Sequence, residues 1–336
     1  MHFNLNNFEI TKISDLKNSE ILVTGGTGFF GRWILEFVIY LNDKYNFNIK
    51  LYLLARKITL ELNQILNTRS EVFFIQNDIR NIKELPENIN YIIHAACTPD
   101  NIEHINNPIE TMNIISLGTK QLLESILRLE NVIKVINLSS GQVYGSNKFE
   151  KIKESDFGNL DCFSIKSIYP ESKRFSETLC KAYETLYRLP IVQVRPFSFI
   201  GPFMSLEKPW AINNFIHDAI KFKKIKIVGN GKPIRSYMYP TDMVEWLFNI
   251  LVNPKNTMAY NLGSEEGISL ENLALSIRDI LGNEIEIDIL NMNDNNDVFL
   301  PNIELSKKEL RVETKVNFKE ALEKTIKWNI SKWTYL

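Results

Sequence analysis

Two kinds of apolar segment alternate along the first two thirds of the chain. Short runs rich in β-branched residues are typical of buried strands, and longer segments with apolar side chains at helical spacing are typical of helices. The expected strands are 21–24, 49–54, 72–75, 91–93, 132–138 and 191–195, and the expected helices are 33–40, 108–129 and 170–189. Strands and helices in this alternation predict an α/β fold with a doubly wound parallel sheet covered on both faces.

The alternation ends after Pro196, where pairs of glycine and proline separate shorter elements. Helices are expected at 211–222, 240–251 and 269–281, and strands at 225–228, 259–262 and 285–289. We therefore expect an N-terminal arm lying over the surface (1–19), a first domain (20–196, with 240–262 returning to it) and a smaller C-terminal α/β lobe (197–239 and 263–336).

A glycine turn joins the first expected strand to the first expected helix. Gly25, Gly28 and Gly31 stand three residues apart, with Phe29 and Phe30 between the last two. The first glycine permits a tight bend, the second lets a diphosphate approach the backbone, and the third lets helix and strand pack closely. The N–H groups and dipole of the helix N-terminus favour phosphate. The turn predicts a dinucleotide site that includes both phenylalanines.

Composition excludes several other classes of function. The net charge is −1 with no basic block, which disfavours a nucleic-acid partner, and no apolar run is long enough to span a membrane. Cys97, Cys162 and Cys180 are far apart and lack metal-ligand spacing, so we expect reduced thiols and no metal. The N-terminal residues do not resemble a signal peptide, and we expect a cytoplasmic protein.

Candidate catalytic residues follow two of the expected strands. Ser140 ends the fifth strand, while Tyr169 and Lys173 open the next helix one turn apart, with Pro170 at a position that suits a helix start. A lysine ammonium, a cationic nicotinamide and a helix N-terminus would each lower the pKa of a phenol. Ser140 could then hold a substrate oxygen while Tyr169 gives or takes its proton. A second Tyr-x-x-x-Lys, Tyr40 to Lys44, closes the first helix and is interpreted as structural.

Several motifs together resemble the extended short-chain dehydrogenase/reductase family, closest to its nucleotide-sugar branch of epimerases, dehydratases and reductases. The motifs are Thr24-Gly-Gly-Thr-Gly-Phe-Phe-Gly31, Asn77-Asp-Ile79, His94-Ala-Ala96, Asn113 with Gly118-Thr119, Leu138-Ser-Ser-Gly-Gln-Val-Tyr-Gly145, Tyr169-x-x-x-Lys173 and Arg195-Pro-Phe. The resemblance covers nearly the whole chain from about Glu20. It implies a Rossmann-type doubly wound sheet, together with a smaller C-terminal lobe that binds substrate.

The resemblance also implies further binding residues. Asp78 and Ile79 would contact the adenine, Ala95 and Ala96 the cofactor diphosphate and ribose, Asn113 the polar network of the site, and Phe197 the nicotinamide. Lys173 would also reach the nicotinamide ribose. Ser140, Gln142, Ser198 and Arg235 are the candidate substrate contacts, with Arg235 on the nucleotide diphosphate. Relatives commonly have asparagine at the position of Ser198, so sugar contacts there do not carry over.

Two departures from the family pattern bear on the reaction. Related dehydratases and decarboxylases carry an acidic residue just after the catalytic serine or threonine, whereas this chain has Gly141 and Gln142. The second expected strand ends near Arg56, where folds that select NAD usually place an acid, so NADP(H) is favoured over NAD. These features favour an NADPH-dependent 4-ketoreductase acting on a nucleotide-linked 4-keto-6-deoxysugar through Ser140, Tyr169 and Lys173.

Other functions remain open on the same motifs. The main alternative is a nucleotide-sugar epimerase with tightly bound NAD; a 4,6-dehydratase and a non-catalytic dinucleotide sensor are less favoured. The family resemblance also implies a homodimer formed through the helix 108–129 and the helix after Tyr169.

Overall fold

The computed structural model describes residues 9–97, 100–145, 150–253, 255, 257–293 and 296–333. The chain forms two compact units, which are described separately. The first unit comprises Met1–Gly145, Gly158–Pro196 and Val244–Tyr260, and the second comprises Ser146–Phe157, Phe197–Met243 and Asn261–Leu336.

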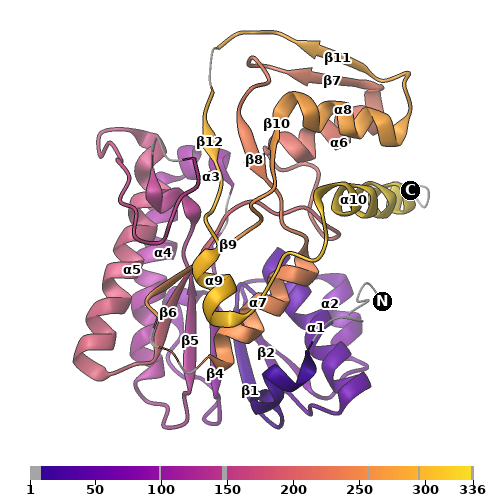
Figure 1. Cartoon of the computed structure of the whole chain (residues 1–336). Coiled ribbons are helices and arrows are strands. Elements are labelled where there is room, and N and C mark those ends of the chain that lie inside the picture. Colours follow the sequence, from indigo (N-terminus) through magenta and orange to yellow (C-terminus); the bar gives the residue numbers. More distant parts are fainter. Residues whose placement is uncertain are drawn as a thin grey trace. The chain divides into compact units, whose positions relative to one another are not determined.

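A seven-stranded sheet with the order β3-β2-β1-β4-β5-β6-β9 forms the centre of the first unit (Figure 1). The strands are β1 (Glu20–Thr24), β2 (Lys50–Ala55), β3 (Val72–Gln76), β4 (Tyr91–His94), β5 (Lys134–Leu138), β6 (Ile191–Pro196) and β9 (Ala259–Leu262). All pairs among β1 to β6 are parallel. The strand order reverses at β1, which pairs with both β2 and β4, and ligands of open α/β sheets bind beyond the carboxyl ends of strands at such a point.

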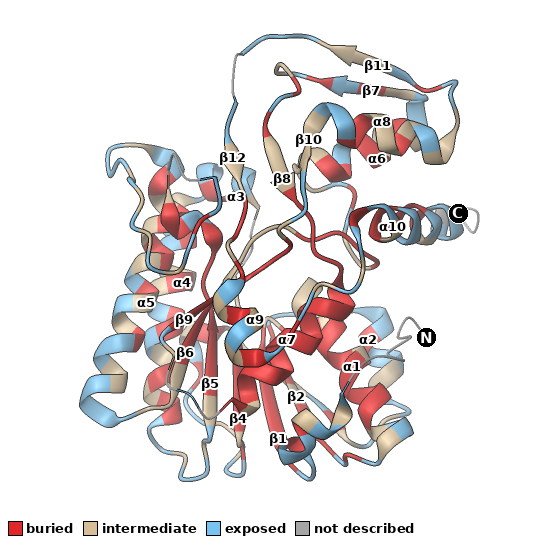
Figure 2. Cartoon of the chain, viewed as in Figure 1, coloured by how far each residue is buried: buried red, intermediate tan, exposed pale blue. Residues whose placement is uncertain are grey.

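Helices of the first unit cover its sheet. They are α1 (Phe29–Tyr45), α2 (Leu60–Leu66), α3 (Asn101–Asn106), α4 (Pro108–Ile126), α5 (Ile168–Tyr187) and most of α7 (Pro240–Val252). Helices α4 and α5 pack side by side (Figure 1). Phe37 of α1 meets Phe248 of α7 edge to face, with ring centroids 4.7 Å apart. Because helices cover the sheet, β1 and β4 are buried along their whole length (Figure 2).

The segment before β1 is not a separate surface arm where the structure describes it. Residues Ile10–Leu16 form a 3-10 helix (η1), and the side chains of Ile13 and Leu16 are completely buried. Such burial makes this helix part of the packed core of the first unit, which corrects the expectation of an arm. Within Ile10–Leu16 two apolar side chains are buried, too few for a periodic pattern to show in the sequence.

The second unit has small sheets and its own core. Its elements are α6 (Ala211–Phe222), β7 (Lys224–Ile227), β8 (Ile234–Ser236), β10 (Gly267–Ser269), α8 (Leu270–Leu281), β11 (Glu286–Ile289), β12 (Val298–Phe299), α9 (Glu304–Leu310) and α10 (Phe318–Trp333). Strands β10, β8 and β12 form one sheet, and β11 and β7 form another. Apolar faces of α6, α8 and α10 share one buried cluster, which includes Phe215, Leu273 and Leu322.

Residues 150–157 belong to this second unit, although the sequence placed them in the first domain. Ile152 forms a parallel bridge with Pro301, and its N–H donates to the carbonyl of Leu300 at 2.9 Å. Asn261 donates to the carbonyl of Ile152 at 2.8 Å. Such long-range pairing has no local sequence signal. The α/β class, the doubly wound parallel sheet and the smaller C-terminal α/β part are confirmed.

Candidate active site

The glycine turn between β1 and α1 is closely packed at two of its glycines and open at the third. Gly25 has a positive φ of 72°, and a Cβ there would lie 2.6 Å from the carbonyl oxygen of Ala95. At Gly31 a Cβ would collide with the carbonyl of Gly26. Around Gly28, by contrast, the nearest atom to a Cβ would be the Gly25 oxygen at 3.2 Å. Gly28 is the exposed N-cap of α1 and has no side chain to cover the helix N-terminus, so an anion can approach the backbone there.

The predicted triad comes together within the first unit. Ser140 follows β5, and Tyr169 and Lys173 lie in the first turns of α5; all three are buried. The side chain of Ser140 acts on the phenol of Tyr169 and lowers its pKa. Nζ of Lys173 lies 5.9 Å from the centroid of the Tyr169 ring and donates to the carbonyl of Leu138 at 2.7 Å. A phenol, a hydroxyl and an ammonium therefore share one site.

Burial controls the resting state of this phenol. Desolvation raises the pKa of Tyr169 well above its ordinary value, and the half-buried Cys97 adds to this, while the side chain of Ser140 lowers the pKa. Tyr169 therefore holds its proton at neutral pH and can donate it. Taking a proton requires added positive charge near the ring, which Lys173 and an oxidised nicotinamide would both provide.

The second Tyr-x-x-x-Lys copy has a different setting. Nζ of Lys44 donates directly to the hydroxyl of Tyr40 at 3.0 Å, and the Tyr45 hydroxyl lies 3.4 Å from that of Tyr40. These residues lie in the C-terminal part of α1, whereas the glycine turn adjoins its N-terminus. The local contacts agree with a structural role.

Residues expected at the adenine end have varied surroundings. Arg56 follows β2, is exposed, and is near enough to Asp78 to contribute to the lowering of that carboxyl's pKa. Asp78 is held mainly by Arg80, whose Nε and Nη2 donate to its two oxygens at 2.9 and 2.8 Å, and its pKa falls to about 2. The side chain of Ile79 is buried in the apolar cluster beneath α4, close to where a Cβ on Gly118 would lie.

A buried polar chain supports the ends of the central strands. Both Ala95 and Ala96 donate their N–H groups to Oγ1 of Thr24, at 3.1 and 3.2 Å. The same oxygen lies 2.7 Å from Nδ1 of His94, whose Nε2 lies 3.1 Å from Oγ1 of Thr119 on α4. Burial and the nearby Lys173 lower the pKa of His94 to about 3, so its imidazole is neutral. These hydrogen bonds fix the backbone of Ala95 and Ala96, which faces Gly25.

The other predicted contacts of the first unit are Asn113, Phe29, Phe30 and Gln142. Asn113 is half-buried on α4. Phe29 and Phe30, in the first turn of α1, are half-buried with their rings edge to face at 6.1 Å. The side chain of Gln142 is exposed, while its backbone N–H donates to Oγ of Ser140 at 3.1 Å. That bond orients the Ser140 hydroxyl.

Three predicted contacts belong to the second unit. Phe197 packs against Phe299, with ring centroids 4.6 Å apart, and the carbonyl of Ser198 accepts the N–H of Met238 at 2.9 Å. Nη2 of Arg235 donates to Oδ2 of Asp297 at 2.7 Å. A phosphate that binds Arg235 must therefore exchange with or join this carboxylate.

Sequence reasoning missed three neighbours of the site residues. His104 of α3 stacks on the ring of Tyr169, with centroids 4.2 Å apart and planes inclined by 7°. Cys97 acts on the pKa of Tyr169, and Asp297 pairs with Arg235. A signal for α3 did exist, because Asp100 is an N-cap residue that accepts the N–H groups of Ile102 and Glu103.

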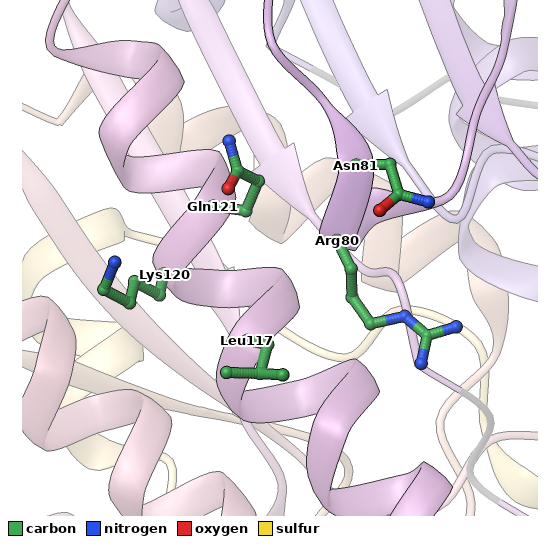
Figure 3. Close-up of a pocket in the computed structure, with 5 residues that line it drawn as sticks. All are labelled: Arg80, Asn81, Leu117, Lys120 and Gln121. Carbon is green, nitrogen blue, oxygen red and sulfur yellow. The ribbon is translucent and has the colours of Figure 1, made fainter.

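A shallow cavity of about 420 Å³ lies on another part of the first unit (Figure 3). It is lined by Arg80, Asn81, Leu117, Lys120 and Gln121. Both cations in its wall are neutralised, since Arg80 pairs with Asp78 and Glu110, and Lys120 pairs with Glu124. The cavity therefore offers little attraction for an anion.

In the described parts of the chain, no helix has the length and apolarity to cross a membrane.

Known proteins resemble this chain over nearly all of its length. UDP-glucuronic acid decarboxylase 6 of Arabidopsis thaliana is 28% identical over 307 residues, covering 91% of this chain and 87% of the relative. UDP-glucuronic acid decarboxylase 1 of Xenopus tropicalis is 26% identical over 315 residues, covering 94% of this chain and 73% of the relative.

Solved structures share the fold. An epimerase from Methanothermobacter thermautotrophicus superimposes with a TM-score of 0.83 at 22% identity, covering 97% of this chain and 96% of that one. A UDP-glucuronic acid 4-epimerase from Bacillus cereus, in complex with NAD, gives a TM-score of 0.79 at 23% identity, covering 92% and 96%.

The family pattern itself extends over most of the chain. The NAD dependent epimerase/dehydratase family matches residues 21–263, which include the glycine turn and all three triad residues. The resemblance drawn from the motifs is thereby confirmed, and so is the expectation of an enzyme. This chain belongs to the NAD-dependent epimerase/dehydratase family, a group of extended short-chain dehydrogenase/reductase enzymes.

Proposed function

We propose that this protein is a nucleotide-sugar 4-epimerase that keeps its NAD bound through each turnover. The observation that carries the proposal is the buried pair of hydroxyls on Ser140 and Tyr169, beside Lys173, with no carboxyl group at 141 or 142. Such a site can move a proton on and off a sugar hydroxyl, but residues 141 and 142 supply no acid for eliminating water.

Epimerisation asks for two opposite proton transfers at one oxygen. The glycine turn would hold NAD, whose nicotinamide would supply reversible hydride transfer at C4 of the sugar. Tyr169 would take the proton from the C4 hydroxyl during oxidation and give it back during reduction. Ser140 would hold the oxygen throughout, and Lys173 would favour the phenolate during the first step.

Decarboxylation is less well supported, although curated relatives include decarboxylases. In the family pattern those enzymes carry a glutamate near the catalytic residue. Gln142 takes that place and cannot exchange a proton as a carboxyl group does.

The second candidate is the NADPH-dependent 4-ketoreductase, and Arg56 is the observation that favours it. Its exposed guanidinium at the end of β2 would attract the 2′-phosphate of NADP. NAD-dependence is the family's usual property, and solved relatives bind NAD. We therefore favour the epimerase, and the experiment below must distinguish it from the reductase.

Cofactor content and product separate these reactions. Mass spectrometry of the denatured, purified protein should show about one NAD per chain, and UDP-glucose, UDP-N-acetylglucosamine or UDP-glucuronic acid should then give its C4 epimer without added cofactor. Little bound NAD, together with NADPH oxidation on a 4-keto-6-deoxysugar nucleotide, would establish the reductase. Release of CO₂ from UDP-glucuronic acid would establish a decarboxylase.

We further propose a homodimer formed by α4 and α5. Both helices carry exposed apolar side chains, with Ile109 73% exposed on α4 and Leu186 71% exposed on α5. Such side chains favour burial against a second copy. Sedimentation should show a dimer that Ile109→Asp converts to a monomer; a wild-type monomer at micromolar concentration would refute this assembly.

A further inference from the structure

A short helix that the sequence did not predict places a flat ring against the proposed acid–base residue. Helix α3 has six residues, and its His104 is only 4% exposed. The imidazole of His104 lies parallel to the Tyr169 ring, with centroids 4.2 Å apart and an angle of 7° between the planes. Both residues belong to the first unit, where α3 also contacts α5 and η4 (Ile165–Ser167).

The phenol needs such a support. A tyrosine side chain can rotate about two bonds, and Ser140 acts only on the hydroxyl at the end of the ring. Nζ of Lys173 lies 5.9 Å from the ring centroid but donates its hydrogen bond to the carbonyl of Leu138, not to Tyr169. A parallel aromatic neighbour fixes the plane of the ring, because any rotation would break the stack.

We infer that His104 is a positioning residue that holds the Tyr169 ring in the orientation needed for proton transfer. It acts through its flat face rather than through proton exchange. This inference deepens the proposed function and rests on it for the identity of the reaction. Small errors in the position of a reacting group reduce rate strongly, so loss of the stack should lower turnover more than binding.

Variants at one position separate flatness from volume. His104→Phe keeps a flat ring without an exchangeable proton, while His104→Leu keeps a side chain of similar volume without flatness. Should His104→Phe prove unstable, His104→Tyr serves as the second flat variant. Ile105→Ala is the matched control, because Ile105 lies on the same helix and is 44% exposed. Thermal unfolding and bound NAD are measured for every variant.

His104→Leu should lower kcat about tenfold, with KM and bound NAD nearly unchanged, and His104→Phe should stay within about threefold of wild type. In the Tyr169→Phe background, His104→Leu should have no further effect, since it acts through Tyr169. Equal losses in His104→Phe and His104→Leu would overturn the inference, because the ring's flatness would then be irrelevant. An unchanged kcat in folded His104→Leu would overturn it as well.

A spectroscopic measurement keeps this inference independent of the reaction. In protein carrying ring-labelled tyrosine, the signal of Tyr169 is identified by its loss in Tyr169→Phe. His104→Leu should shift that signal by removing a ring current, and His104→Phe should largely preserve it. If no nucleotide sugar reacts with wild type, the proposed reaction fails, yet this shift still tests the contact. An unmoved signal in His104→Leu would refute the stack.

Discussion

Tyr169 combines two requirements that oppose each other. Burial excludes water from the reacting oxygen but raises the pKa of the phenol, so ionisation depends on the surrounding groups. Nζ of Lys173 lies 5.9 Å from the centroid of the ring, and the side chain of Ser140 lowers the pKa of the phenol. The residue should therefore be indispensable for chemistry and unimportant for holding cofactor.

Tyr169→Phe tests that separation. The change removes the exchangeable proton but keeps the ring and its stack on His104, so kcat should fall by about 10² to 10⁴ while bound NAD stays constant. Tyr40→Phe is the matched control, since Tyr40 is likewise followed four residues later by a lysine, which here donates a hydrogen bond to the Tyr40 hydroxyl. Steady-state kinetics with a nucleotide sugar give the comparison. Turnover that survives in Tyr169→Phe would remove this phenol from the mechanism.

Arg235 is expected to act on binding alone. Its guanidinium can make two parallel bonds to a diphosphate, whereas a lysine ammonium cannot. Arg235→Lys should therefore raise KM for the nucleotide sugar about tenfold and change kcat by no more than about threefold. As a control, Lys232→Arg alters a nearby exposed cation and should leave KM unchanged. Isothermal titration with UDP gives an independent measure, and equal affinity in wild type and Arg235→Lys would contradict the assignment.

At the scale of elements, we expect the turn between β1 and α1 to serve both folding and cofactor binding. Gly31→Ala forces a Cβ against the carbonyl of Gly26, and the resulting overpacking should lower the free energy of unfolding by about 1–3 kcal/mol. At Gly28 the nearest atom to an added Cβ is 3.2 Å away, so Gly28→Ala should fold nearly normally. That Cβ would nonetheless enter the space expected for the diphosphate.

Bound NAD and thermal stability, measured together, distinguish the two variants. Both should lose NAD, but only Gly31→Ala should lose stability in the apoprotein. Full retention of NAD in Gly28→Ala would mean that the diphosphate lies elsewhere.

Elements with a strong local pattern were predictable, and those fixed by distant contacts were not. The strands β1 to β6 and the helices α4 and α5 follow from apolar periodicity, because each buries a continuous face. Helix α10 was overlooked despite buried Phe318, Leu322 and Ile326 at helical spacing. Helix α3 is too short for periodicity to identify, so the partner of Tyr169 on it was missed as well.

Within the candidate site the same distinction holds. Ser140, Tyr169 and Lys173 could be placed together because the carboxyl ends of parallel strands lie at one edge of the sheet. The pairing of Arg235 with Asp297 spans 62 positions and depends on β12 pairing with β8, which no local motif indicates. Likewise, residues 150–157 belong to the second unit because Ile152 pairs with Pro301, which is distant in sequence.

For the whole molecule, the buried His94 predicts a loss of stability in mild acid. Its folded-state pKa of about 3 lies below the ordinary value of 6.5, so the unfolded chain binds a proton that the folded chain does not. The stabilisation is complete above pH 6.5 and is lost as the pH falls toward 3, by roughly 1.4 kcal/mol per pH unit. Asp78, with a pKa of about 2, contributes only below its ordinary value of 3.8.

Urea unfolding at pH 7, 6 and 5 measures this slope. His94→Gln can still hydrogen-bond to Thr24 and Thr119 but does not titrate, so its slope over this range should be smaller. The Tyr40→Phe variant, which leaves His94 intact, should keep the wild-type slope. Identical slopes for His94→Gln and wild type would show that His94 does not govern the pH dependence.

The reaction proposed for the molecule is tested most directly by proton NMR of UDP-linked sugars incubated with the purified protein, with no cofactor added. The account predicts that the C4 epimer of at least one of UDP-glucose, UDP-N-acetylglucosamine and UDP-glucuronic acid appears, and that Tyr169→Phe abolishes it. Conversion that occurs only when NADPH is supplied and consumed, or a UDP-pentose as the product, would contradict it.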